Sequence, residues 1–199
     1  MQNFLSVLLL SVSSNLDTVT VAISYGMNKI KIPWISSLLI AIISTLGTFL
    51  SMEFGSLLVD FIPANLADLI GGLMLIVIGV WFLIDFLRKN KTVKSSYDQD
   101  LIIYENFMVD KDNSGDISIK ETIPLALALT INNLGVGIAA SITGISILYS
   151  TICTFIVTLI SIWCGSWIGQ GVASKLLGKY APIISSILLI ILGIYESFM

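Results

Sequence analysis

Hydrophobic residues occur along this chain in six long runs separated by short polar segments. We place the runs at residues 3–26, 34–58, 66–88, 122–147, 151–171 and 181–198, with a short turn at 148–151 between the fourth and the fifth. Each run has the roughly 20 apolar residues with which an α-helix crosses a hydrocarbon layer of about 30 Å. The pattern predicts an all-α integral membrane protein with six transmembrane helices.

The first three runs and the last three read as two copies of one unit. Segment 70–81 matches 184–195, so that Gly79 corresponds to Gly193, and upstream the segment 15–23 matches 130–138. An odd number of spans per copy makes the second copy enter the bilayer in the opposite direction. Such inverted repeats are typical of secondary transporters, whose site lies near the midplane where the copies meet. The predicted domains are a first membrane repeat at 1–88, a cytoplasmic linker at 89–121 and a second membrane repeat at 122–199.

The charged residues predict the orientation. All ten Lys and Arg residues lie in the loops after the first, third and fifth runs or at their edges, and these loops share one face of the membrane. The positive-inside rule makes that face cytoplasmic. The loop 60–68 on the opposite side has acids and no Lys or Arg. We therefore expect a multi-pass plasma-membrane protein with both termini outside.

Composition excludes several classes of protein. The chain is 56% hydrophobic and 12% charged, which no soluble globular domain of ordinary composition matches. It has no histidine, which excludes histidine zinc sites and Ser-His-Asp hydrolases, and it has no phosphate-binding glycine loop. We expect no enzymatic activity. The expected partners are lipid and a small inorganic cation and not nucleic acid, and a homodimer is left open.

Asp17 is the candidate functional residue of the first run. It lies about halfway along the run, where an ionisable side chain costs at least about 2.5–3.5 kcal/mol to insert. The alternative is a structural carboxylate hydrogen-bonded to neighbouring hydroxyl or amide groups. Asn15 and Thr18 beside it add oxygen atoms without adding charge.

The second copy places asparagine where the first has its aspartate. Asn132 corresponds to Asp17, and Asn133 follows it. One carboxylate with several neutral oxygens suits Mn²⁺ or Mg²⁺, while a monovalent ion or a proton is also open. Ser44 and Thr48 share one face of the second run, either as further ligands or as small residues at a helix contact.

Other polar and small residues have a plainer expectation. Thr158 in the fifth run is a further oxygen donor, with close helix packing as the more ordinary role. Gly135 and Gly137 either loosen the fourth helix or let it pack closely. Glu53 and Glu196 stand toward the outer ends of their runs, where we expect solvated carboxylates, with a role in the exit path as the alternative.

The linker contains a sequence that resembles the twelve-residue calcium loop of EF-hands. Gly115 stands at the sharp turn, and the candidate ligands at loop positions 1, 3, 5, 7, 9 and 12 are Asp110, Asp112, Ser114, Asp116, Ser118 and Glu121. Residues 97–109 are expected to form the entering helix. EF-hands normally pair and no second loop occurs here, so an acidic solvated turn is the alternative to Ca²⁺ binding.

With these motifs the chain resembles the MntP-type manganese efflux pump family. The duplicated three-span unit and the serine-aspartate motif in its first span carry that resemblance. The calcium-loop insert and residues 21–26 are most similar to its branch of YtaF-type sporulation membrane proteins. The resemblance implies a plasma-membrane protein of endospore-forming bacteria that moves a divalent cation outward without hydrolysing nucleotide. It also implies that Asp17 is the family's first aspartate and that Asn132 replaces the second.

Two functional hypotheses follow. The first is a secondary-transporter-type cation permease that uses Asp17 near mid-membrane and carries Mn²⁺ or another divalent cation. The second is a sporulation membrane protein that does not transport, with a calcium-sensing or docking loop on its cytoplasmic face.

Overall fold

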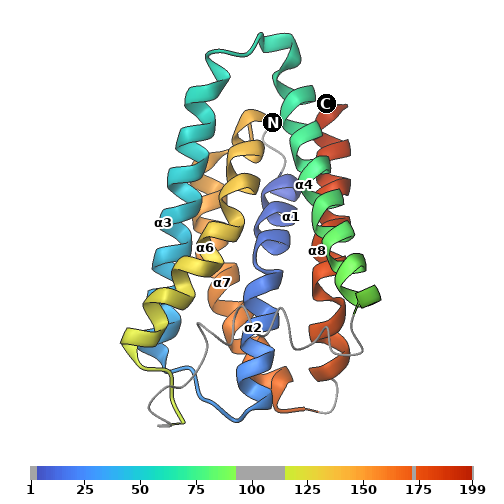
Figure 1. Ribbon diagram of the computed structural model, residues 1–199. Coiled ribbons are helices and arrows are strands. Elements are labelled where there is room, and N and C mark those ends of the chain that lie inside the picture. Colours follow the sequence, from blue (N-terminus) through green and yellow to red (C-terminus); the bar gives the residue numbers. More distant parts are fainter. Residues whose placement is uncertain (1–3, 93–114, 172–173, 199) are drawn as a thin grey trace.

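The computed structural model describes residues 4–92, 115–171 and 174–198, which form a bundle of long helices lying side by side (Figure 1). The helices are α1 (Phe4–Ser14), α2 (Leu16–Met27), α3 (Trp34–Val59), α4 (Ala64–Thr92), α6 (Ile119–Ile142), α7 (Ile147–Gly169) and α8 (Ser174–Ser197). α1 and α2 follow each other along one pass of the bundle. The all-α membrane class predicted from the sequence is confirmed.

The six predicted runs differ in how well they meet the requirements of a membrane span. Four spans are long and apolar enough within the described residues: Phe4–Met27, Trp34–Val59, Leu66–Asp85 and Ile147–Gly169. α6 becomes a fifth if its two halves, which are bent by 41° at Asn132, count as one span. The apolar part of α8, Ile183–Ser197, is shorter than the others.

The turn predicted at 148–151 is wrong, because α7 already begins before it. Gly144, with φ of +75°, ends α6 in the left-handed conformation that suits glycine. The Gly144 N–H donates to the Ser141 carbonyl at 3.0 Å, and the Ile145 N–H donates to the Ala140 carbonyl at 3.2 Å. This is the hydrogen-bond pattern of a Schellman C-cap, so the glycine decides where the helix stops.

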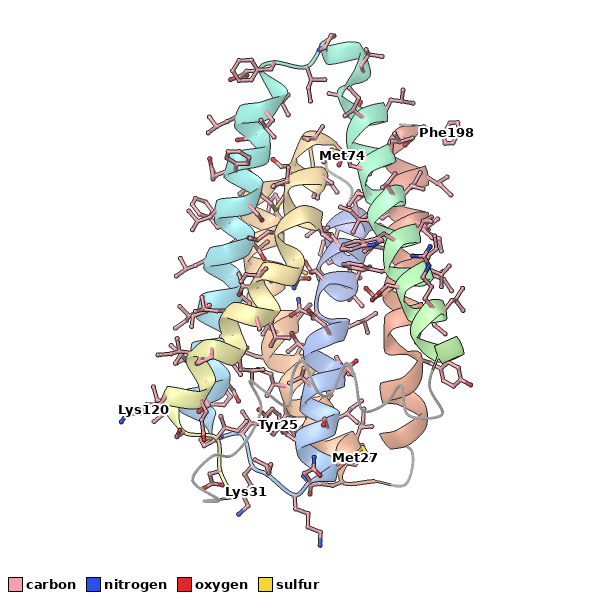
Figure 2. All side chains as sticks on the ribbon, in the orientation of Figure 1. Tyr25, Met27, Lys31, Met74, Lys120 and Phe198 are labelled. Carbon is pink, nitrogen blue, oxygen red and sulfur yellow. The ribbon has the colours of Figure 1, made fainter. Side chains whose placement is uncertain are left out.

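The two ends of the bundle differ. α1 begins and α8 ends toward one end, together with the α3–α4 and α6–α7 turns; we call this the terminal end (Figure 1). The other end, the linker end, has the α2–α3 connection and the start of α6. Figure 2 shows Lys31 and Lys120 at the linker end and Phe198 at the terminal end.

Two separate apolar clusters fill the interior. The terminal-end cluster is formed by Val7, Leu10, Met52, Leu75, Val136, Ala139, Ala140, Ile145, Leu189 and Leu192. The linker-end cluster is formed by Val21, Tyr25, Ile40, Ile117, Leu125, Ala126, Leu129 and Ile162. On α1 and α2, the buried stretch from Ser11 to Thr18, which lies between the two clusters, is largely polar.

Glycines bring several helix pairs to backbone contact. A Cβ atom on Gly26 of α2 would lie 2.9 Å from the Cα of Gly169 on α7. A Cβ atom on Gly55 of α3 would lie 2.6 Å from the Ile138 carbonyl oxygen on α6. Gly137 likewise packs closely on α3, where a Cβ atom would overlap Ser51. Within a membrane the hydrophobic effect does not drive helices together. Small residues at the contacts let the helix backbones approach closely, so that van der Waals packing stabilises the pair.

We expect Gly169→Ala to lower the thermal stability of the protein, because the new methyl group would overlap the Ile23 carbonyl oxygen. Overpacking of this kind costs about 1–3 kcal/mol. Gly135→Ala is the matched control, since its Cβ would lie 3.6 Å from Ile78 Cδ1, an ordinary contact. The apparent Tm of both variants in detergent, followed by size-exclusion chromatography, tests this. Equal stability of the two variants would contradict the close crossing of α2 and α7.

Candidate functional site

The first pass is interrupted near its middle at Asn15. α1 ends at Ser14 and α2 begins at Leu16, while Asn15 has φ of −106° and ψ of 4°. The Asn15 backbone N–H donates to the Val12 carbonyl at 3.1 Å, one residue short of the normal helical partner. A break of this kind removes intrahelical donors from the last carbonyl groups of α1. In a hydrocarbon layer those carbonyls require other protein donors.

Side chains supply these donors. The Asn15 side-chain amide donates to the Ser11 carbonyl at 2.8 Å. Ser185 of α8 donates its hydroxyl to the Ser13 carbonyl at 2.9 Å, and Asn133 of α6 donates its amide to the Ser14 carbonyl at 2.6 Å. Helices distant in sequence therefore stabilise the break.

Asn15 itself is buried, with 2% of its surface exposed, and contacts α7. Its Oδ1 atom accepts a hydrogen bond from the Thr158 hydroxyl at 2.6 Å. The same hydroxyl lies 2.8 Å from the Thr154 carbonyl oxygen. The Thr158 hydroxyl has one proton, which it shares between these two acceptors. The lone pairs of its oxygen remain available to bind a cation.

Asp17 lies in the first turn of α2, directly after the break. Its Oδ1 atom accepts the Thr18 backbone N–H at 2.6 Å, and the Thr18 hydroxyl lies 3.4 Å from the same atom. The start of a helix carries unpaired N–H groups and the positive end of the helix dipole, both of which stabilise a negative charge. The break thus provides a favourable place for a carboxylate in the middle of the pass.

α6 has its own interruption, at the residue that the sequence match pairs with Asp17. It bends by 41° at Asn132, between Ile119–Ile131 and Asn133–Ile142. The side chain of Asn132 lies outside the described part of the structure, so its role stays a prediction. Asn133, the next residue, joins the two interruptions through its hydrogen bond to Ser14.

Ser44 and Thr48 lie away from the break at Asn15, on α3. The neighbouring Gly47 packs against Thr130 of α6, two residues before the bend at Asn132. The Ser44 hydroxyl is buried without a hydrogen-bond partner, whereas the Thr48 hydroxyl donates to the Ser44 carbonyl at 3.0 Å. Of the two, Ser44 has the hydroxyl better able to accept a ligand.

Sequence reasoning did not identify Ser185 or the Ser14 carbonyl as parts of this site. A signal for Ser185 was present, because Ser185 and Ser186 stand in an otherwise apolar stretch where the first copy has Gly71 and Gly72. The carbonyl has no such signal, since every residue has one and only the break makes it available.

The calcium-loop candidates are described only in part. Asp110, Asp112 and Ser114, with the expected entering helix 97–109, lie outside the described residues. Gly115 has φ of +80°, as the sharp turn of such a loop requires. Among the described residues, no group of three or more Asp, Glu, His or Cys side chains could hold a metal ion.

The end of this loop is anchored to the bundle. Lys31 donates its N–H to the Gly115 carbonyl at 2.9 Å, and Ile117 donates its N–H to the Lys31 carbonyl at 3.1 Å. The Ser36 hydroxyl donates to the Ile117 carbonyl at 3.0 Å. The Ile117 side chain is buried in the linker-end cluster. A short β-bridge between Lys31 and Asp116 thus holds this end of the linker against the α2–α3 connection.

A capping box then starts α6. Glu121 Oε2 accepts the Ser118 N–H at 2.9 Å and the Ser118 hydroxyl at 2.8 Å. This arrangement satisfies donors at the helix N-terminus and fixes where α6 begins. The Asp116 carbonyl precedes the anchored Ile117, so the second half of the loop leads directly into the helix that bends at Asn132.

Comparisons with known proteins agree with the motifs. A family model described as "Putative manganese efflux pump" matches residues 1–83 and 101–195. The "Probable sporulation protein YtaF" of Bacillus subtilis (strain 168) is 31% identical over 212 residues, which cover 96% of this chain and 98% of that protein. The "Putative manganese efflux pump MntP 2" of Clostridium botulinum (strain Langeland / NCTC 10281 / Type F) is 24% identical over 200 residues, 96% of this chain and 92% of that protein. No solved structure matches the chain significantly.

We expect Thr158→Val to destabilise the protein, since the substitution keeps the shape and removes the donor to Asn15. Hydrogen bonds between membrane helices contribute about 0.6 kcal/mol on average and up to about 1.7 kcal/mol. Thr151→Val is the control, because its hydroxyl donates within α7 to the Ile147 carbonyl. A double-mutant cycle of Thr158→Val with Asn15→Ala, measured by denaturant unfolding in detergent, isolates the pair. Coupling no larger than for Thr151→Val would contradict the hydrogen bond across the break.

Proposed function

This chain belongs to the Mntp family of manganese efflux pumps, and on that basis we propose that it is a cation permease of the secondary-transporter type whose ion site lies at the break in its first pass. Its family consists of transporters and not enzymes, as the sequence predicted. The observation that carries the proposal is the interruption of α1–α2 beside Asp17, joined by Asn133 to the interruption of α6. Broken helices at mid-membrane are where such transporters bind their ions.

The atoms around the break suit a hard divalent cation. Asp17 supplies a carboxylate, Asn15 and Thr158 supply amide and hydroxyl oxygens, and Ser14 supplies a carbonyl at the helix end. Such oxygens are the ligands that Mn²⁺ and Mg²⁺ prefer, and the family name favours Mn²⁺. A single carboxylate favours moderate affinity, which a carrier requires because the ion must leave again.

Contacts between the helices support two inverted repeats, at 1–88 and 122–199, on either side of the linker 89–121. A Cβ atom on Gly79 would meet the Ser186 carbonyl at 2.9 Å, and one on Gly193 would meet the Gly72 carbonyl at 2.5 Å. The sequence match pairs Gly79 with Gly193 and Gly72 with Ser186, so the two contacts are the same contact seen from each repeat. α1–α2 runs from the terminal end to the linker end and α6 runs the opposite way (Figure 1).

The same equivalence holds at a second helix pair. Gly165 of α7 packs against Ala22 of α2, and Gly137 of α6 packs against Ser51 of α3. The repeat match relates Ala22 to Gly137 and Ser51 to Gly165. We call the buried polar groups around the break at Asn15 the polar layer. These paired contacts favour a pseudo-two-fold axis through this layer.

The position of the site between the two apolar clusters suggests how access alternates. Each cluster closes one end of the bundle above or below the break. Rocking of one repeat against the other would open one cluster while the other stays packed. The lysines at the linker end favour a cytoplasmic position for that end, with both termini outside.

We expect Asp17→Asn to abolish manganese export, because it removes the carboxylate at the break and keeps its size. The host is a bacterium without its own exporter, and the measurement is cellular manganese by elemental analysis at matched expression. Glu53→Gln, on an exposed part of α3, is the control and should export like the unsubstituted chain. Export by Asp17→Asn at the unsubstituted rate would exclude Asp17 as the ion ligand. A chain that inserts in the membrane and leaves manganese unchanged would contradict manganese export itself.

A second candidate function rests on the linker. The relative named as a sporulation protein matches nearly the whole chain, and the described half of the calcium loop has the turn and the start of the exiting helix that a calcium loop requires. Under this proposal the chain is a sporulation membrane protein whose cytoplasmic loop binds Ca²⁺. Because Glu121 starts α6, binding there would change the angle of the helix that bends at Asn132.

We expect Ca²⁺ binding to be lost in Glu121→Gln, which removes the carboxylate of loop position 12 and keeps an oxygen for the capping box. Asp116→Asn is the control, since loop position 7 binds through its backbone carbonyl. Isothermal titration of the full chain with Ca²⁺, with hydrogen exchange of residues 97–125, measures both. Equal heats for the two variants would exclude the loop as a calcium site.

A further inference from the structure

Glu196 is a buried acid at the terminal end of α8. Only 8% of its surface is exposed, and its Oε1 atom is buried without a hydrogen-bond partner. The expectation of a solvated carboxylate is therefore wrong for Glu196, whereas Glu53 on α3 is exposed as expected. The difference arises because α1 and α4 both pack against α8 and cover Glu196.

No positively charged side chain among the described residues compensates this acid. The Lys and Arg side chains that the structure describes, Lys29, Lys31, Arg88 and Lys120, stand in or beside the loops after the first and third runs. The polar groups that act on Glu196 are the Ser6 hydroxyl of α1 and the Asp68 carboxylate of α4. Of the other helices in contact with α8, α7 contributes Cys153 at the terminal-end cluster, and α2 carries Asp17 beyond that cluster.

An ionised carboxylate in this position would be unstable. Burying an unpaired charge is unfavourable, and the charged group that acts on Glu196, Asp68, is another acid. The side chain is stable if it binds a proton or a cation. A divalent cation needs several oxygen ligands, whereas the groups that act on Glu196 are one hydroxyl and one further carboxylate. A proton needs only the carboxylate, and a neutral carboxylic acid suits the apolar surroundings.

Glu196 is also aligned with the ion site. Ser185, which bonds the Ser13 carbonyl at the break, lies eleven residues earlier on α8, three turns away on the same face. On α1, Ser6 and Ser13 likewise share a face, and both hydroxyls are buried. Leu189 and Leu192 fill the interval between the two polar levels. The terminal-end cluster thus has Glu196 on one side and the proposed ion site on the other.

We propose that Glu196 is a proton-binding site of the terminal end, which holds a proton while the terminal-end cluster is closed and releases it when that cluster opens. The proton adds to a carboxylate oxygen to give the carboxylic acid, and it returns to water when the side chain is hydrated. The proton site itself does not depend on the proposed permease function. The coupling of proton release to cation transport rests on that function.

Infrared spectroscopy of the full chain in lipid tests the proton site. We expect a carboxylic acid C=O band that persists above about pH 4.3, where an ordinary glutamate ionises. Glu196→Gln should lose this band, Glu53→Gln should retain it, and Asp17→Asn identifies any contribution from Asp17. A band unchanged by Glu196→Gln would overturn the proposal.

Vesicles that contain the purified chain test the coupling. Mn²⁺ is the transported probe, and a pH-sensitive dye inside the vesicles reports proton movement. The unsubstituted chain and Glu53→Gln should move protons in the direction opposite to Mn²⁺. Glu196→Gln should lose this proton movement. Proton movement unchanged in Glu196→Gln would exclude the coupling. If the unsubstituted chain moves no Mn²⁺, the permease proposal is wrong, and the infrared band alone decides the proton site.

Discussion

A hydrocarbon layer offers no water to a backbone carbonyl, and this constraint governs the middle of the bundle. The break at Asn15 exposes the carbonyls of Ser11, Ser13 and Ser14, which therefore bond to side chains of Asn15, Ser185 and Asn133. The polar layer is therefore a structural necessity as well as a candidate ion site. The side chains that stabilise the break bring carboxylate, amide and hydroxyl oxygens together around it.

The glycine contacts make these short hydrogen bonds geometrically attainable. Serine and asparagine side chains reach a neighbouring backbone only when the helix axes lie close, and bulky residues along the contact would separate them. Gly26 and Gly169 bring α2 against α7, and Gly79 and Gly193 bring α4 against α8. Close packing and the polar layer are thus two aspects of one arrangement, in which small residues stand on both sides of the break.

The linker end shows how a loop can be connected to this arrangement. Ile117 is anchored by the Lys31 bridge and by Ser36, and its side chain is part of the linker-end cluster. Four residues later Glu121 completes the cap that starts α6. The anchored end of the linker therefore leads into the helix that bends at Asn132, beside the candidate ion site. At the terminal end, Glu196 is buried on the side of the terminal-end cluster that faces away from the break.

The sequence by itself determined the helical membrane class, the positions of most passes, the family and the candidate Asp17. These follow from hydropathy, charge and motif, which are local properties of the chain. It misplaced the turn at 148–151 because Gly144, and not hydropathy, stops α6. Only the tertiary structure decided that α1 and α2 break at Asn15, that the Ser14 carbonyl and Ser185 belong to the site, and that Glu196 is buried while Glu53 is exposed. The physical reason is that exposure and hydrogen-bond partners depend on which helices pack against a residue, and that packing joins segments more than a hundred residues apart.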